Sequence, residues 1–257
     1  MNRIRLSLAT LAAAVLAASV TFMVPRPAGA QLFRQDLTLH QTTTSTGMMG
    51  KGGGAPQPST LYLSANGMRH SEADGNDMIM LFAQSKMIFV DHKKKTYSEV
   101  TFEGLQQKVD QTASQMSKGM SKEQMEAMRQ VMGGAGGAFR VTKAGAGETI
   151  AGYATEKWLM AFGPVEMEIS ATPELKVPAA YYNAMKLRMP ANPMFDMGKM
   201  YDEMKKINGM TLKSVMNMKI MNMTSTTTTV VTSIEKGSIP ASTFEIPAGY
   251  KVGPSRF

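Results

Sequence analysis

The chain has 257 residues and a formal charge of +8, with 43% hydrophobic and 19% charged residues. This composition is typical of a globular protein of one or two domains, and it excludes a disordered or fibrous chain. The absence of cysteine excludes disulfides, thiolate metal sites and cysteine nucleophiles. Methionine is unusually frequent, with 26 residues, and any functional hypothesis has to account for it.

The first 30 residues have the pattern of a secretory signal peptide. Arg3 and Arg5 precede an apolar run from Leu6 to Val24, and Ala28–Gly29–Ala30 has the small residues of a cleavage site. We expect cleavage after residue 30, which leaves residues 31–257 as a periplasmic or secreted protein. The alternative is an uncleaved membrane anchor, since the apolar run approaches spanning length.

Residues 32–100 show the short apolar and β-branched runs of an antiparallel meander. Asn66–Gly67 is a strong hairpin signal, and a second turn is expected at Gln84–Lys86. The cluster His92–Lys95 lies between two further strand-like runs, so we expect a solvated turn there. We therefore predict no nucleic-acid partner and at most a weak contact with an anionic membrane surface.

Two later segments change to helical periodicity, near residues 102–132 and 179–207. Ser121–Gln124 fits a capping box, and the methionines that follow it recur at three- and four-residue steps. Strand-like runs return between and after these segments. The sequence thus predicts a single α+β domain, a curved antiparallel β-sheet with helices covering its concave face.

Four segments resemble one known family: Asn66–Arg69, Met87–Tyr97, Glu148–Trp158 with the pattern I-x-G-Y-x-x-x-K, and Phe244–Tyr250 with the pattern F-x-x-P-x-G-Y. Together they resemble the secreted bacterial family catalogued as domain of unknown function 4412. The resemblance implies a half-barrel similar to the lipoprotein carriers LolA and LolB, with an apolar cavity beneath helices. The family has no assigned catalytic residues, so the resemblance supplies none.

No arrangement of residues points to an enzyme. His40, His70 and His92 have no second histidine or carboxylate partner at ligand spacing in the sequence, which argues against metal binding through histidine. The glycine run 133–137 lacks the Lys-Ser/Thr pair of a phosphate loop. Glu166 and Glu168 are expected to be exposed on one face of a strand. We predict a non-enzymatic protein without catalytic residues.

The methionines support a ligand-binding hypothesis. A flexible, methionine-lined surface adapts to varied apolar ligands, so we expect a cavity for an acyl chain or similar lipid-like molecule. Its predicted lining is the two helical stripes of Met125, Met128, Met132, Met194, Met197, Met200 and Met204.

Three alternative roles remain open for the methionines of this chain. Thioethers select Cu(I), and copper is the one cofactor we consider. Two M-x-M pairs could bind it: Met216, Met218, Met221 and Met223. A structural or interaction role in the cell envelope would need the methionines only for packing. They could also act as a sink for oxidants. The oligomeric state and any protein partner are not predicted.

Overall fold

The computed structural model describes residues 35–47, 54–118, 121, 123, 139–162, 164–177, 197–220 and 223–254. The first six strands are β1 (Leu37–Gly47), β2 (Gln57–Leu63), β3 (Gly67–Glu72), β4 (Asn76–Leu81), β5 (Lys86–Asp91) and β6 (Thr96–Thr101). The others are β7 (Arg140–Ile150), β8 (Tyr153–Phe162), β9 (Val165–Thr172), β10 (Met210–Ile220), β11 (Met223–Lys236) and β12 (Lys251–Val252). The helices are α1 (Phe102–Lys118), α4 (Met197–Met204) and the 3-10 turn η2 (Ala241–Phe244).

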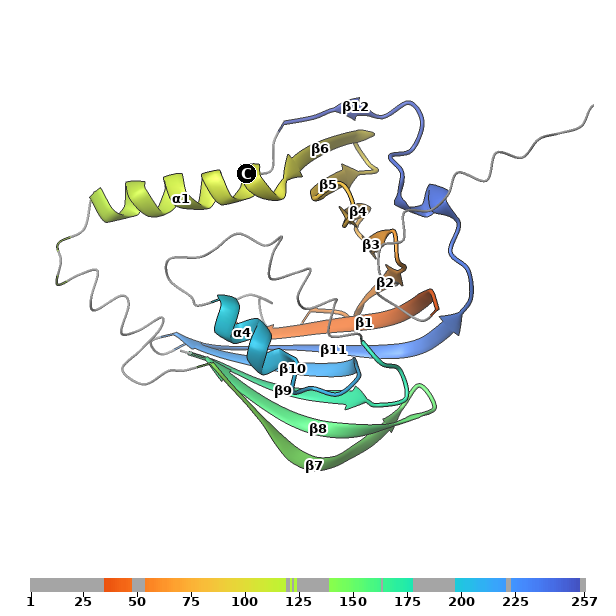
Figure 1. The fold of residues 1–257 in the computed structure, drawn as a ribbon, viewed down its shortest axis with the longest axis vertical. Coiled ribbons are helices and arrows are strands. Elements are labelled where there is room, and N and C mark those ends of the chain that lie inside the picture. Colours follow the sequence, from red (N-terminus) through yellow and green to blue (C-terminus); the bar gives the residue numbers. More distant parts are fainter. Residues whose placement is uncertain are drawn as a thin grey trace, which may run out of the picture.

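All twelve strands belong to one curved sheet (Figure 1). Their order is β12-β6-β5-β4-β3-β2-β1-β11-β10-β9-β8-β7, and every neighbouring pair is antiparallel except β12 and β6. Two meanders, β1–β6 and β7–β11, therefore join where β1 pairs with β11. At this seam the Thr43 and Thr229 hydroxyls lie 2.9 Å apart.

The tight turns follow from local sequence. The expected Asn66–Gly67 hairpin is confirmed, and the Ser64 amide donates to the Gly67 carbonyl at 3.0 Å. A side chain at Gly67 would begin only 2.2 Å from the Met80 carbonyl oxygen, so glycine is required there. Ala151 and Gly152 have φ of 48° and 84°, which suits the two-residue turn between β7 and β8.

The outer, convex face of β3–β6 is covered by the C-terminal segment. Ile239 and Phe244 pack against three buried strand residues, Ile79, Ile88 and Val90. By contrast, the convex face of β7–β10 carries ion pairs. Lys157 pairs with Glu168, and Lys213 pairs with Glu148. A sheet face of this kind is expected toward water.

The prediction of helices covering the concave face is wrong. Helix α1 packs through Phe102 and Leu105 beside β6 and then extends away from the sheet (Figure 1). Its sequence is mostly polar, and its apolar residues form one narrow stripe that begins at Phe102 and Leu105, the two residues that join a core cluster. The curved antiparallel sheet was predicted, but the described part of the chain is mainly sheet and does not form the helical cover implied by LolA and LolB.

The signal peptide expected over residues 1–30 lies outside the described residues. Within the described ranges, no helix has the length and apolar character needed to cross a membrane. The expected capping box is described only at Ser121 and Glu123, where the Ser121 hydroxyl donates to the Glu123 carboxylate at 2.8 Å.

Candidate ligand-binding surface

Strand register places two rows of methionine on the same, concave face of the sheet. The first methionine row is Met68, Met80 and Met87, from β3, β4 and β5. The second methionine row is Met160, Met167 and Met216, from β8, β9 and β10. Residues directly opposite each other in antiparallel strands share a face, and the pairings across β11, β1 and β2 place both rows on one face, where the second row meets β1 at Ser45 and the first at Leu37.

A polar strip separates the two rows. Its side chains pair with one another, including Ser45 with Thr227 at 3.2 Å. His70 Nε2 lies 3.1 Å from the Gln41 amide nitrogen, across β2. The middle of the concave face is therefore polar from Gln41 to Ser45 of β1 but apolar at Leu37 and Leu39, which belong to a buried cluster with Leu212 and Val231.

Helix α4 lies over the second methionine row. Met204 and Ile207 pack in the same cluster as Trp158, Met160 and Ile169. Trp158 and Met160 are each only 7% exposed, and Ile207 is 4% exposed. This region combines flexible thioethers with an indole, which suits an apolar ligand of irregular shape.

The Trp158 indole N–H has no hydrogen-bond partner among the described residues, although its nitrogen is buried. Leaving a buried donor unpaired costs about 1–3 kcal/mol, and such groups in native proteins call for an explanation. An acceptor atom on a bound molecule would remove that cost.

Charged residues stand beside this donor on the same face. Lys143 pairs in register with Trp158, and its Nζ lies 5.8 Å from the centroid of the indole ring. The same Nζ lies 2.6 Å from the Glu156 carboxylate. The Trp158 end of the region is thus polar, whereas the Phe139 and Phe162 rings lie 5.6 Å apart at its far end.

Glu203 links α4 to the edge of the sheet. Glu203 accepts a hydrogen bond from the Val141 backbone N–H at 2.9 Å, on the edge strand β7. Its bonds with Lys206 and then with Val141 hold the pKa of Glu203 below its ordinary value. Burial of Tyr201, which lies on the same helix, raises the pKa of its phenol.

Three of the seven predicted ligand-binding methionines lie in the described residues. Met197, Met200 and Met204 belong to α4, and Met204 contacts the cluster beneath that helix. The other predicted residues lie outside the described residues: Met125, Met128, Met132 and Met194.

The predicted copper residues are only partly brought together. Met216 and Met218 share one face of β10, as the alternation requires, and Met223 lies in β11. Met221 lies outside the described residues. Sequence inspection missed Met160 and Met167, whose alternation with Trp158 and Ile169 was the available signal.

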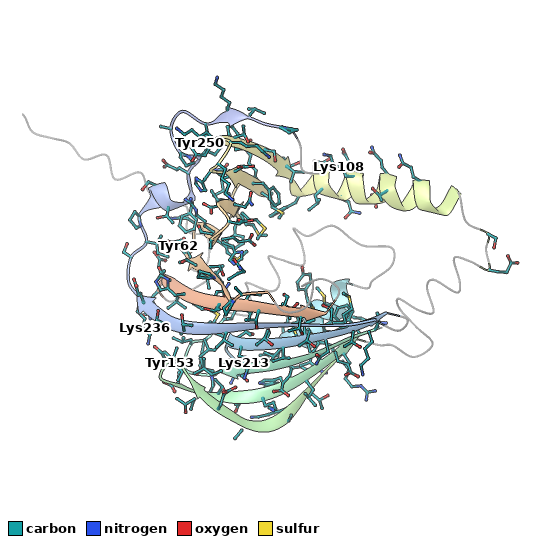
Figure 2. The ribbon with its side chains drawn as sticks, turned by 180° about the vertical axis from the view of Figure 1, so that it is seen from behind. Tyr62, Lys108, Tyr153, Lys213, Lys236 and Tyr250 are labelled. Carbon is teal, nitrogen blue, oxygen red and sulfur yellow. The ribbon has the colours of Figure 1, made fainter. Side chains whose placement is uncertain are left out.

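A buried network of hydrogen bonds and ion pairs on the convex face holds the C-terminal segment against the sheet. The Asp77 carboxylate accepts from Arg69 Nε at 2.9 Å and lies 2.7 Å from His92 Nε2. Arg69 also donates to the Thr243 carbonyl, and His92 Nδ1 lies 2.7 Å from the Tyr250 hydroxyl. Figure 2 shows Tyr250 at this end of the molecule, far from Tyr153 and Lys236.

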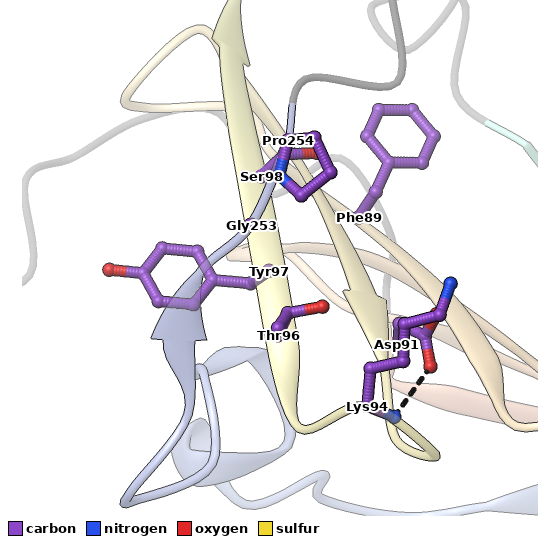
Figure 3. Close-up of a pocket in the computed structure, with 8 residues that line it drawn as sticks. All are labelled: Phe89, Asp91, Lys94, Thr96, Tyr97, Ser98, Gly253 and Pro254. Carbon is purple, nitrogen blue, oxygen red and sulfur yellow. Dashed lines mark hydrogen bonds and ion pairs between the residues drawn. The ribbon is translucent and has the colours of Figure 1, made fainter.

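A small pocket of about 150 Å³ lies where β12 joins β6. Figure 3 shows its lining, in which Lys94 pairs with Asp91 at 3.2 Å below the Phe89 ring. Ligand sites for drug-sized molecules usually occupy ~300–1,000 Å³, so this pocket is small for an acyl chain.

Across the described residues, no group of three or more His, Asp or Glu side chains is placed to hold a metal ion. The described ranges thus offer no site of the carboxylate or histidine type that Zn²⁺ or Ca²⁺ prefers.

Comparisons with known proteins add a family but no activity. The model of a family described as "Domain of unknown function (DUF4412)" matches residues 49–250. No curated protein matches the chain. One solved structure, titled "Structure of PNGF-II in C2 space group", aligns at 10% identity over 86% of this chain and 31% of its own, with a TM-score of 0.40. This chain therefore spans less than a third of that protein, and a likeness so weak carries no argument.

Proposed function

This chain belongs to the DUF4412 family, a domain of unknown function, and we propose that it is an exported, non-enzymatic protein that binds a fatty acyl chain beneath α4. The observation that carries the proposal is the unpaired, buried indole N–H of Trp158 inside a methionine-rich cluster. A carboxylate oxygen of the ligand would accept this hydrogen bond, and Lys143 would balance its charge.

The apolar part of the ligand would run along the second methionine row. From Trp158 to Phe162 the strand advances four residues, or ~13 Å at the usual rise of ~3.3 Å per residue. Over this distance the concave face presents Met160 and Met167, with Phe139 at the far end. Each buried methylene group contributes about 0.8 kcal/mol, so an acyl chain of ordinary length would bind even after the cost of ordering it.

Titration with a fluorescent fatty acid tests the proposal. We expect saturable binding with a Kd in the micromolar range or below, and energy transfer from Trp158, which is the protein's single tryptophan. Trp158→Phe keeps an aromatic ring but removes the donor. Because hydrogen bonds to charged groups contribute ~1.5–3 kcal/mol, probe fluorescence should report an affinity lower by at least ~10-fold.

Met80→Leu in the first methionine row is the matched control, and its affinity for the fatty acid should equal that of the unmodified protein. Absence of binding, together with an empty protein in native mass spectrometry after mild purification, would contradict the proposal. A structural or interaction role in the cell envelope would then take its place. Equal affinities for the Trp158→Phe variant and the unmodified protein would contradict the assigned position.

A further inference from the structure

We propose that His70 and three methionines on β3 and β4 form a site for Cu(I) on the concave face. The four residues are Met68, His70, Met78 and Met80. This inference does not depend on the acyl-binding proposal, because the two sites lie in different halves of the sheet and share no residue.

Register brings the four side chains together as a square. Met68 is paired with Met80, and His70 is paired with Met78, in adjacent antiparallel strands. Side chains alternate along a strand, so all four lie on the same face. Paired residues have Cβ atoms about 4.5–5.5 Å apart, and all three thioethers and the imidazole can reach one point above the sheet.

The burial of these residues suits a bound soft ion. Met80 is 3% exposed, and Met68 and Met78 are half-buried against the same cluster of phenylalanine and valine residues. The His70 side chain is 27% exposed, so the site is buried from solvent at Met80 and accessible to solvent at His70. An ion could enter from the concave face without unfolding of the sheet.

The donor set selects the metal. Thioethers favour Cu(I), imidazole suits copper as well, and Ca²⁺ and Mg²⁺ require oxygen ligands. The four donors include no carboxylate or thiolate. The second methionine row has no histidine, so the two regions differ in the chemistry they offer.

Neighbouring side chains prepare His70 for this role. The Glu72 carboxylate lies 3.8 Å from His70 Nδ1, and the Gln41 amide nitrogen lies 3.1 Å from Nε2. Because an amide nitrogen can only donate, His70 Nε2 accepts from Gln41 and carries the lone pair that a metal ion would use. On loading, Nε2 would exchange the Gln41 amide for the ion.

Titration of the protein with Cu(I) under anaerobic, reducing conditions tests the site, in competition with a chromophoric Cu(I) chelator. We expect one equivalent to bind more tightly than micromolar. His70→Gln and Met78→Leu should each weaken binding at least tenfold, and Met68→Leu combined with Met80→Leu should abolish it. Leucine conserves the methionine volume, so these variants should remain folded.

Met160→Leu combined with Met167→Leu is the matched control and should bind Cu(I) as the unmodified protein does. The unmodified protein also gives an independent readout with Ag(I), a soft monovalent ion without redox chemistry. Its methionine methyl NMR signals should shift for Met68, Met78 and Met80 only. Retention of all the copper by the chelator, an equal loss in the control, or shifts confined to the second methionine row would overturn the proposal.

Discussion

The two halves of the sheet carry the same kind of methionine row but differ in what lies behind it. Behind the first row, the convex face is covered by Ile239 and Phe244 and closed by the Asp77 network. Behind the second row, the convex face carries ion pairs and faces water. The first half is therefore held from both sides, and the second half depends on its concave face and α4.

We therefore expect the half of the sheet with the first methionine row to contribute most to stability, and the half with the second row to bind the ligand. A strand region packed on both faces has few ways to move, whereas a helix held by few contacts belongs to the less stable part of a fold. Four predictions test the contrast, from the largest expected effect to the smallest.

Replacing Asp77 with alanine should have the largest effect. The carboxylate is 3% exposed and is the common partner of Arg69 and His92. Removing one partner of a buried ion pair costs about 3–5 kcal/mol because it leaves an uncompensated charge. Denaturant unfolding should show this loss. Lys86→Ala, which breaks an ion pair with Glu99 at the surface of the same half, should change stability by less than ~1 kcal/mol. Equal losses would show that the network does not hold the C-terminal segment.

Shortening one buried methionine in each row compares the two concave regions directly. Met80→Ala and Met160→Ala should each cost ~2–5 kcal/mol, and the leucine variants should each cost less than ~1.5 kcal/mol. Both residues are more than nine-tenths buried. Added fatty acid should stabilise Met80→Leu as much as it stabilises the unmodified protein, and should stabilise Met160→Leu less, because binding stabilises the folded state and Met160 belongs to the proposed site. Equal stabilisation of the two variants by the fatty acid would refute the division of roles.

Lys143→Met should weaken the binding of a fatty acid by ~2–5-fold and leave the binding of its methyl ester unchanged. The side chain is 51% exposed, so its contribution is that of a surface charge. Fluorescent-probe displacement measures both ligands. Lys213→Met, on the convex face, is the control and should alter neither affinity. A parallel loss for the ester would indicate a packing effect of Lys143.

The smallest effect is expected from pH. The folded-state pKa of Glu203 lies below its ordinary value of 4.5, so ionised Glu203 stabilises the fold above that value. This contribution is lost as pH falls through the lower, folded pKa. Glu203→Gln should therefore lower the unfolding midpoint slightly at neutral pH and leave it unchanged below the folded pKa, which removes that part of the acid dependence of unfolding. A pH profile identical to that of the unmodified protein would contradict a role for Glu203 in holding α4.

Local features of the fold were predictable from sequence. The Asn66–Gly67 hairpin and the turn at His92–Lys95 depend on two to four adjacent residues, and both occur as expected. Strand β7 was harder to predict, because Ala144–Gly147 has weak strand propensity. The structure continues the strand through this segment with two register shifts.

The candidate site depends on contacts that sequence patterns do not contain. Periodicity within one segment cannot show that Met160, Met167 and Met216 are neighbours, because their alignment comes from the pairing of three strands. The sequence argues against metal binding at His70, because no second histidine lies at ligand spacing. Its cross-strand neighbour in the proposed site, Met78, is contributed by the opposite strand.

The hydrogen bond from Val141 to Glu203 has a consequence for how this protein behaves at high concentration. Strand β7 ends the sheet, and an uncovered edge strand is a template for pairing with another chain. Glu203 occupies one of its free amides and adds a negative charge there. Any displacement of α4 that admits a ligand to Trp158 also removes this protection, so ligand entry and resistance to aggregation are opposed at the same helix.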